Sequence, residues 1–451
     1  MAKQNKLRAA DSKAPARPTK SKVDRESVAP PRRESDRVVE ASGPFGAIVS
    51  RRAADRLRAG HVWVYASDLE SIALPDGGEE NPPALLNVAD GRGVLLGTAL
   101  YSPSSQIVLR LVSREAIDEA AWLKLLEARL RAAIARRKPM LDVANDACRL
   151  CFSEADELPG IIADKYGDLV ILQLLTRGLN HGPVRDACVR ALREELKPAA
   201  IIERPDPRIR ELEGLPAPDA ESLWHAGKKR PAMSAQFHLN GLAFHFDANS
   251  GQKTGAFLDQ RANYAAAQEY AQRLGATRSL DVCCYQGGFA LHLACVCKQV
   301  TGIDTSRASL EVAEKNLALN RAQIGADVDW IEADAFTILR DWSQSGKSFD
   351  AIVLDPPAFA KSKRAVEGAL RGYKELNLRA MKMLRPGGLL VTCSCSHHVG
   401  WADLEAVLAA AAADASRRVR LLARRGAAPD HPVALNLPET EYLKCLILEV
   451  E

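Results

Sequence analysis

Hydrophobic and polar positions form their most regular pattern from residue 279 onwards. Short apolar runs alternate there with segments in which apolar residues recur every three or four positions. This alternation predicts strands separated by helices, an order typical of an open and mostly parallel sheet. Because no helical pattern separates the last two strands, we expect the last of seven strands to be antiparallel. The predicted strands are 279–284, 299–304, 328–332, 351–354, 389–393, 419–423 and 443–450, and the helical patterns include 309–319, 368–384 and 402–413.

The pattern ahead of this sheet is mixed. Short β-like runs such as 93–101 are separated by turns rich in glycine, proline and serine, which predicts a small β-rich domain. The spacing of Trp122, Leu125, Leu126 and Leu130 then predicts a helix within 116–137. The predicted domains are therefore a β-rich domain over 45–115, a central α+β domain over 116–246 and an α/β domain over 247–451.

Residues 1–44 form a segment without sustained apolar periodicity, rich in lysine, arginine, serine, alanine and proline, which predicts a disordered arm. The whole chain has a net charge of +4. Residues 1–42 hold eleven Lys/Arg and six Asp/Glu, so this segment contributes +5 and the remainder −1. A basic arm can recruit RNA by counterion release, and the alternative is a solvated tail without a partner.

The composition is that of a folded protein with several cores. The chain has 451 residues, of which 47% are hydrophobic and 26% charged, enough for about three domains of ~150 residues. It has neither an apolar run of about 18 residues nor a signal-peptide pattern, so we expect a cytoplasmic protein that does not contact a membrane. The ten cysteines are then expected to be reduced. Cys148 and Cys151 form a C-x-x-C without a second ligand pair, so no metal site is predicted.

Polar and glycine residues follow the first four predicted strands of the α/β domain. In such sheets, ligands bind beyond the carboxyl ends of the strands. One carboxylate there is often only a helix cap, but the whole set fits a ligand with a ribose and an adenine and no phosphate. Because the first turn lacks the three spaced glycines of the dinucleotide fingerprint, S-adenosylmethionine is predicted rather than NAD or FAD. These residues are Tyr285, Gln286, Gly287 and Gly288 after the first strand, then Asp304, Asp334 and Asp355 after the next three.

Two cysteines near the end of the fifth predicted strand are expected to differ. Cys393 falls inside the strand, where cysteine is usually a small core residue. Cys395 lies just past it and is either an inert thiol or a nucleophile that attacks C6 of a pyrimidine, which makes C5 reactive towards a methyl group. Asp355 is the predicted group that holds N3 of the base and stabilises the developing charge. The base that removes the C5 proton stays open between His397, His398 and water.

Several motifs resemble those of one known family, the bacterial RlmI-like methyltransferases, which make 5-methylcytosine in large-subunit ribosomal RNA. The resemblance covers about residues 47–450, nearly everything except the arm. Several motifs in one order are more specific than any single motif. They are Gly-Gln-Lys-Thr-Gly at 251–255, Leu-Asp-Gln-Arg at 258–261, Tyr-x-Gly-Gly-Phe at 285–289, Leu-Asp-Pro-Pro at 354–357, Ser-Cys-Ser at 394–396 and Asp-His-Pro-Val at 430–433.

The resemblance implies a domain plan and a set of site residues. It implies a Rossmann-like class I methyltransferase domain, preceded by a PUA-like β-barrel that binds structured RNA and by a central domain that helps to position the substrate. It also implies S-adenosylmethionine as the cofactor, 23S ribosomal RNA as the substrate and Cys395 as the nucleophile. The cofactor residues that it implies are Gln260, Arg261, Tyr285, Gln286, Gly287, Gly288, Asp304, Asp334 and Asp355.

Two other functions are compatible with the sequence alone. One is N-methylation of guanine or adenine in ribosomal RNA, in which the Asp-Pro-Pro loop would orient an exocyclic amine and Cys395 would be dispensable. The other is a non-catalytic RNA-binding or ribosome-assembly factor that keeps the fold. The sequence leaves open the target nucleotide, the choice between naked RNA and an assembling particle, and the oligomeric state, with a homodimer as one option.

Overall fold

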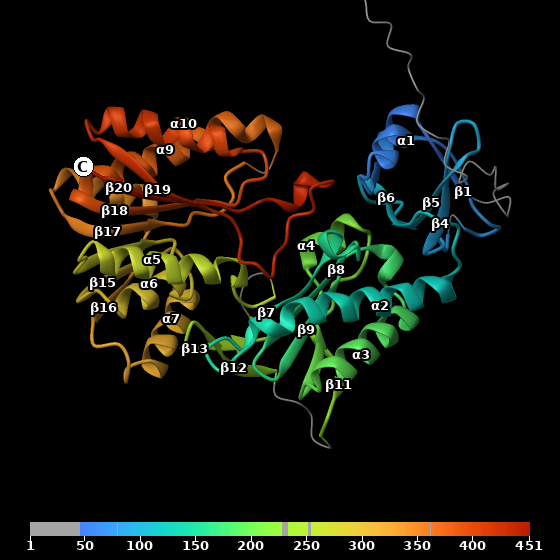
Figure 1. Cartoon of the computed structure of the whole chain (residues 1–451), viewed down its shortest axis with the longest axis horizontal. Coiled ribbons are helices and arrows are strands. Elements are labelled where there is room, and N and C mark those ends of the chain that lie inside the picture. The colour runs from blue at the N-terminus through green and yellow to red at the C-terminus, as the bar shows by residue number, and fades with distance from the viewer. Residues whose placement is uncertain (1–45, 79, 228–232, 251–253, 361) are drawn as a thin grey trace, which may run out of the picture. The chain divides into compact units, whose positions relative to one another are not determined.

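The computed structural model describes residues 46–78, 80–227, 233–250, 254–360 and 362–451, which form three larger sheets and a hairpin (Figure 1). The predicted arm over 1–44 lies outside the described residues, as do residues 251–253 of the Gly-Gln-Lys-Thr-Gly motif. The three sheets follow one another along the chain in the predicted order.

The first sheet has six short strands and one packed helix. Helix α1 (Arg51–Arg58) begins after Ser50, whose hydroxyl accepts a hydrogen bond from the Ala53 amide. Ala53 and Leu57 lie on the same side of α1 and are buried in the core of the sheet. The β-like run predicted at 93–101 corresponds to β5. The strands are β1 (Gly46–Val49), β2 (Trp63–Tyr65), β3 (Leu69–Ala73), β4 (Leu85–Asp90), β5 (Leu95–Tyr101) and β6 (Ile107–Ser113), in the order β2-β6-β5-β4-β1-β3.

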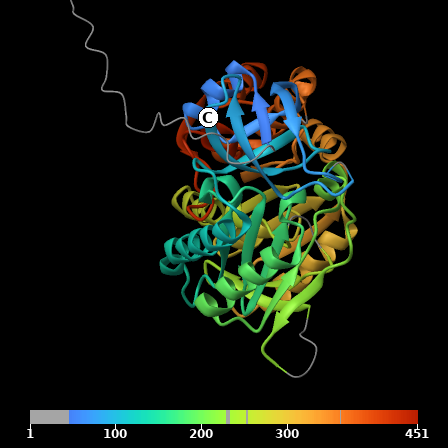
Figure 2. The ribbon, with the colours of Figure 1, turned by 90° about the vertical axis from the view of Figure 1, so that its right-hand side faces the viewer.

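The second sheet has five strands and shares one core with two helices. Helices α2 (Glu119–Arg137) and α3 (Gly182–Leu196) lie side by side (Figure 1 and Figure 2). Trp122, Leu126 and Leu130 of α2 are buried in this core, so their spacing predicted the helix correctly. The strands are β7 (Ala147–Phe152), β8 (Ile161–Tyr166), β9 (Leu169–Leu174), β10 (Ala200–Glu203) and β11 (Glu221–His225), in the order β11-β10-β9-β8-β7, and helix α4 (Pro207–Leu212) follows β10.

An antiparallel hairpin precedes the third sheet along the chain. It consists of β12 (Ser234–Leu239) and β13 (Leu242–Asp247). The ring of Phe246 stacks on that of Tyr166 in β8, with the ring centroids 4.4 Å apart. Both rings belong to a hydrophobic core that also contains Phe289, which lies in a helix packed on the third sheet. The hairpin therefore packs with both of the larger sheets that flank it in the sequence.

The third sheet confirms the predicted seven-stranded architecture with an antiparallel last strand. Its order is β16-β15-β14-β17-β18-β20-β19, and β20 pairs antiparallel with both of its neighbours. Helices α5, α6 and α7 pack on one face, and α8, α9 and α10 pack on the other (Figure 1). The strands are β14 (Arg278–Val282), β15 (Gln299–Asp304), β16 (Asp327–Glu332), β17 (Phe349–Leu354), β18 (Leu384–Ser394), β19 (Val419–Arg425) and β20 (Lys444–Val450), and the helices are α5 (Arg261–Arg273), α6 (Gly288–Ala294), α7 (Arg307–Leu319), α8 (Ala335–Gln344), α9 (Val366–Met383) and α10 (Trp401–Asp414).

Strand β18 is longer than predicted. It begins at Leu384 rather than at residue 389, and its register with β17 shifts between Phe349 and Ala351. The shift lies where Gly387 has a φ of +74°, a conformation that glycine adopts without strain. Gly387 therefore lies at an irregularity within a continuing strand.

Candidate active site

A cavity of about 550 Å³ lies at the carboxyl ends of the parallel strands, where the sequence predicted a ligand site. All five parallel strands that precede β19 are followed by predicted site residues or their direct neighbours that line the cavity. The predicted residues that line the cavity are Gln260, Tyr285, Gly288, Asp304, Asp355 and Cys395. Arg261, Gln286, Gly287 and Asp334 are not among the described residues that line it. The volume falls in the range of small-molecule sites.

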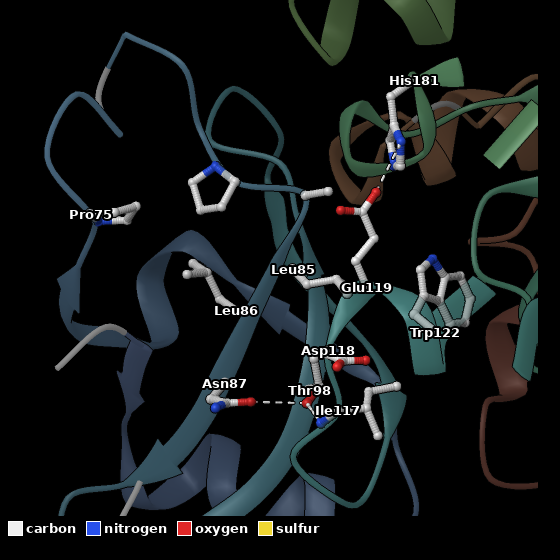
Figure 3. A pocket seen from close by; sticks show the side chains of 12 residues that line it. Pro75, Leu85, Leu86, Asn87, Thr98, Ile117, Asp118, Glu119, Trp122 and His181 are labelled. Carbon is white, nitrogen blue, oxygen red and sulfur yellow. Dashed lines mark hydrogen bonds and ion pairs between the residues drawn. The ribbon is translucent and has the colours of Figure 1, made fainter. Parts of the chain in front are cut away.

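A second cavity, of about 450 Å³, lies between β4, β5 and the start of α2 (Figure 3). Leu85 and Trp122 contribute apolar surface to it, and the Glu119 carboxylate lies 3.6 Å from the His181 ring. Among the residues that the structure describes, no predicted site residue lines this cavity. We therefore take the cavity at the strand ends as the candidate site.

The turn after β14 has a tightly curved backbone. Cys283 and Tyr285 have φ values of +63° and +50°, which are strained for residues other than glycine. The Tyr285 amide donates a 2.8 Å hydrogen bond to the Asp304 carboxylate, which holds the turn against the end of β15. At Gly288, a Cβ atom would lie 2.4 Å from the Tyr264 ring, so glycine is required for the close packing of α6 on α5.

Asp304 connects two backbone segments at the cavity. One carboxylate oxygen accepts from Tyr285, and the other accepts a 2.9 Å hydrogen bond from the Ser306 amide. A carboxylate offers about four lone-pair sites, so these two bonds leave acceptor capacity on both oxygens. Because Asp304 also lines the cavity, it fits the hydroxyls of a ribose.

Asp334 caps a helix. Its carboxylate accepts 2.9 Å hydrogen bonds from both the amide and the hydroxyl of Thr337, at the start of α8. The side chain is exposed, whereas its neighbours Ala333 and Ala335 line the cavity. The helix cap considered for a single carboxylate therefore describes Asp334 in this structure, and a contact with adenine stays a prediction.

Gln260 and Arg261 occupy different environments although they are adjacent. The Gln260 side chain donates a 3.0 Å hydrogen bond to Asp355 and accepts a 2.7 Å bond from Asn263. Arg261 is 7% exposed and donates a 3.0 Å bond to the Ala147 carbonyl at the start of β7. Gln260 thus orients a cavity residue, while Arg261 anchors the start of α5 to the second sheet.

Cys395 lines the cavity and lies between two anchored serines. The Ser394 hydroxyl donates to the Tyr373 hydroxyl at 2.9 Å, and the Ser396 and Tyr373 hydroxyls are 3.0 Å apart. The Ala360 amide donates to the Ser396 hydroxyl at 3.2 Å. Both serines are fully buried, whereas Cys395 is half-buried. These contacts fix the backbone on both sides of the thiol.

Two other cysteines near the cavity have thiols whose pKa is raised. Cys393 is fully buried opposite Cys445 of β20, and the contact with Cys445 and burial raise the pKa of its thiol well above the usual range. This confirms that Cys393 is a core residue. Cys283 lines the cavity, but burial and the nearby Asp304 raise the pKa of its thiol.

The sequence interpretation missed several residues around the site. Arg208, an exposed side chain of α4, lines the cavity and brings the second sheet's domain to it. Tyr442 also lines the cavity, and its hydroxyl donates to the Asp259 carboxylate. Asp281 is fully buried behind the first turn, accepts a 2.8 Å bond from the Ala290 amide and has its pKa raised by burial. No local motif marks Arg208 or Tyr442, because only the tertiary fold brings them to the strand ends.

The Asp-His-Pro-Val motif at 430–433 connects the second and third sheets. Asp430 is fully buried and accepts a 2.9 Å hydrogen bond from the Arg149 amide of β7. Its carbonyl oxygen accepts bonds of 3.3 and 3.1 Å from Arg137 of α2. Burial alone would raise the pKa of Asp430, but the His431 ring, the Arg261 side chain and the Arg149 amide lower it below its ordinary value.

Within the residues that the structure describes, no helix is both long and apolar enough to cross a membrane. In the same residues, no group of three or more His, Cys, Asp or Glu side chains is arranged to hold a metal ion.

Two family models match the chain. A model described as S-adenosylmethionine-dependent methyltransferase matches residues 157–440, and a model described as PUA-like domain matches residues 47–114. Among curated proteins, the chain is 36% identical over 386 residues to ribosomal RNA large subunit methyltransferase I of Erwinia tasmaniensis, covering 85% of this chain and 94% of that protein. It is also 36% identical over 394 residues to the protein of the same name from Shewanella denitrificans, covering 86% and 95%.

The fold is similar to that of solved methyltransferase structures. A Streptococcus mutans protein assigned as an S-adenosylmethionine-dependent methyltransferase matches with a TM-score of 0.74 at 18% identity, covering 90% of this chain and all of that one. SMU.776, assigned as a methyltransferase and solved in complex with SAH, matches with a TM-score of 0.73 at 18% identity and the same coverage. At this level of identity the likeness concerns the fold.

Proposed function

The chain belongs to the S-adenosylmethionine-dependent methyltransferases, among relatives named ribosomal RNA large subunit methyltransferase I, and from this premise we propose that it makes 5-methylcytosine in 23S ribosomal RNA. The observation that carries the cytosine-C5 assignment is the position of Cys395 in the same cavity as Asp304 and Asp355. C5 of a pyrimidine is a poor nucleophile until a thiolate adds at C6, whereas N-methylation of an exocyclic amine needs no thiol. A cysteine that lines this cavity therefore favours carbon methylation.

The cavity suits S-adenosylmethionine, which supplies a methyl group on a sulfonium. Asp304 keeps acceptor capacity for the ribose hydroxyls, as described above, and the tight turn that ends at Gly288 brings backbone close to the cavity. Tyr285 and Asp355 complete the predicted cofactor residues that line it.

The side chains of this enzyme would carry the reaction in four steps. The Cys395 thiolate forms a bond from Sγ to C6 of the cytosine, which moves electron density to C5. Asp355, held by Gln260 and protonated in this step, donates its proton to N3, where negative charge develops, and takes the proton back when the thiolate leaves. C5 then forms a bond to the methyl carbon while the bond from that carbon to the sulfonium sulfur breaks, so the sulfur leaves as a neutral thioether. A base removes the C5 proton, the Sγ–C6 bond breaks, and Cys395 leaves as a thiolate while the ring regains aromaticity.

An RNA substrate is supported by two features outside the sheet. The segment 47–114 matches the PUA-like domain model, and Arg208 presents a cation at the cavity. A base inside a helix cannot reach Cys395, so the target nucleotide must be flipped out of its stack. We further propose that the enzyme acts in the cytoplasm, because its ribosomal RNA substrate is found there.

The first test is nucleoside mass spectrometry on unmodified ribosomal RNA after incubation with the protein and methyl-labelled S-adenosylmethionine. We expect labelled 5-methylcytidine. Labelled methylguanosine or methyladenosine would replace the proposal with N-methylation. No label on naked RNA or on ribosomal particles, together with no cofactor binding in calorimetry, would favour a non-catalytic RNA-binding factor.

The Cys395→Ala variant tests the role of the thiol. We expect methyl transfer to fall below about one thousandth of the wild-type rate, with cofactor affinity nearly unchanged. Cys295→Ala is the matched control, because Cys295 is also half-buried and its thiol contacts the Leu291 carbonyl away from the cavity. Strong residual activity in Cys395→Ala would contradict a covalent mechanism.

A further inference from the structure

Lys444, the first residue of β20, is a buried lysine next to the proposed nucleophile. It is 3% exposed and lies opposite Ser394 in the pairing of β20 with β18. Its Nζ donates a 2.9 Å hydrogen bond to the carbonyl oxygen of Ser396, the residue after Cys395. Lysine is rarely buried without a paired group, because its ammonium loses hydration. The position of Lys444 therefore calls for a compensating negative charge nearby.

Most charged side chains that line the cavity oppose ionisation of a thiol. Asp259 and Asp355 line the same cavity, and negative charge near a thiol disfavours the thiolate. The Tyr442 phenol lies at the same cavity, and burial together with Asp259 raises its pKa, which keeps it neutral. A thiolate at Cys395 therefore needs a cation to balance this acidic surrounding.

The other titratable neighbours do not replace Lys444. Tyr373 contacts both serines beside Cys395, and burial raises the pKa of its phenol, so it stays uncharged at neutral pH. Desolvation of the His397 ring, followed by the nearby Lys444 and His398, lowers the pKa of His397 and favours its neutral form. Arg208 lines the cavity from α4, on a different element from the strands that hold the thiol.

Lys444 itself is affected by the nucleophile. Burial lowers the pKa of the Lys444 ammonium, and attraction to Cys395 and Glu441 raises it in part. Such an effect is reciprocal, because a cation that is stabilised by an anion also stabilises that anion. The hydrogen bond to Ser396 holds the ammonium at the segment that carries the thiol.

We propose that Lys444 is a positioning residue for the methyl transfer, which holds the Cys395 segment through the Ser396 carbonyl and stabilises the Cys395 thiolate by its positive charge. The proposal rests on the proposed function and adds a residue to its site. When Cys395 ionises, its proton passes to water and the ammonium of Lys444 balances the charge on Sγ. Formation of the Sγ–C6 bond removes that charge, and cleavage of the bond returns it. Lys444 therefore raises the fraction of thiolate available for attack and favours departure of the thiolate.

Alkylation of Cys395 by iodoacetamide tests this role without methyl transfer. The rate, followed across pH by mass spectrometry of the Cys395 peptide, reports the fraction of thiolate. Lys444→Met removes the charge, and Lys444→Gln removes the charge but keeps a hydrogen-bond donor. In both variants we expect the alkylation midpoint to rise by about one pH unit, a roughly tenfold loss of thiolate below the midpoint. Lys444→Arg keeps the positive charge, so its alkylation midpoint should stay close to that of the wild-type protein.

Two controls separate charge from structure. Tyr373→Phe removes the serine contacts without changing a charge, so it should lower turnover equally at all pH values and leave the midpoint unchanged. Lys374→Met removes a surface lysine of α9 that pairs with Asp414, and it should change neither quantity. Calorimetric binding of S-adenosylmethionine serves as the check that each variant is folded.

The outcomes distinguish this inference from the proposed function. An unchanged alkylation midpoint in folded Lys444→Met or Lys444→Gln protein would overturn the role of Lys444. A shifted midpoint in a protein whose wild type makes no 5-methylcytidine would support the pairing of Lys444 with Cys395 while rejecting the proposed reaction. If Lys444→Met does not bind cofactor, Lys444→Gln carries the test, because its amide can still donate to Ser396.

Discussion

Gln260 donates a 3.0 Å hydrogen bond to the Asp355 carboxylate, and this bond joins the segment ahead of α5 to the loop after β17. Gln260→Leu should leave Asp355 without this donor and with greater freedom to rotate. We expect kcat/KM to fall by about 10- to 100-fold, the value of a hydrogen bond to a charged group. Gln272→Leu, an exposed position on α5, is the control. Unchanged steady-state kinetics in Gln260→Leu would contradict a role for this bond.

Asp304 and Asp334 allow a direct comparison of two carboxylates that follow neighbouring strands. Asp304→Asn should weaken S-adenosylmethionine binding by about tenfold, because the amide group is a poorer acceptor for the ribose and for the Tyr285 and Ser306 amides. Asp334→Ala should lower the free energy of unfolding by about 1 kcal/mol through loss of the α8 cap, with a smaller loss of affinity. Calorimetry and thermal denaturation measure the two effects. An equal loss of cofactor affinity in both variants would instead indicate that Asp334 contacts the adenine of the cofactor.

Arg208 should contribute to RNA binding if the cavity takes a flipped nucleotide. Arg208→Ala should raise KM for RNA several-fold and reduce the salt dependence of binding by about one unit of slope, as expected when one phosphate contact is lost. Arg273→Ala, an exposed arginine of α5, should do neither. Weaker cofactor binding with unchanged RNA binding would show that Arg208 holds the methionine carboxylate instead.

The first sheet should lose stability in acid through Asp90. Burial alone would raise the pKa of Asp90, but the hydrogen bond from Arg58 and the amides of Val94 and Arg92 lower it from 3.8 to about 2. A carboxyl with a depressed pKa stabilises the fold above its unfolded-state pKa, and this contribution is lost as pH falls from about 4 to 2. Asp90→Asn should therefore unfold more easily at pH 7 and differ little from wild type near pH 2.

Hydrogen exchange in residues 46–113 at a series of pH values would measure this effect. Asp76→Asn removes a carboxylate at an exposed position and is the matched control. A constant difference between Asp90→Asn and wild type across the whole acid range would show that the effect does not come from ionisation of Asp90.

Sequence alone predicted the third sheet well because its pattern is local. Apolar runs marked the strands, and the strand ends marked the cavity at which Asp304, Asp355 and Cys395 lie. The positions of individual side chains were harder to predict. Asp334 follows its strand in the same way as Asp304, yet it turns to the first amides of α8 instead of the cavity. Sequence position does not distinguish these two orientations.

Contacts between distant parts of the chain could also not be predicted from the sequence. Arg261 bonds to Ala147 at the start of β7, so it serves the junction of two sheets rather than the cavity. Arg208 reaches the cavity from α4. Lys444 did offer a local signal, since a charged residue opens a strand that is otherwise apolar through Leu448. A lysine in such a strand must be either exposed at the end of the strand or buried beside a group that compensates its charge.

The position of β20 between β18 and β19 has a consequence for the order of events in folding. β19 is synthesised before β20, yet β20 is its partner in the sheet. Until β20 inserts, the edge of β18 is open, β19 is unpaired and the carbonyl of Ser396 lacks Lys444. A chain emerging from the ribosome therefore completes its sheet and its site in one late step. An enzyme proposed to modify ribosomal RNA thus becomes competent only after the ribosome that makes it has synthesised β20.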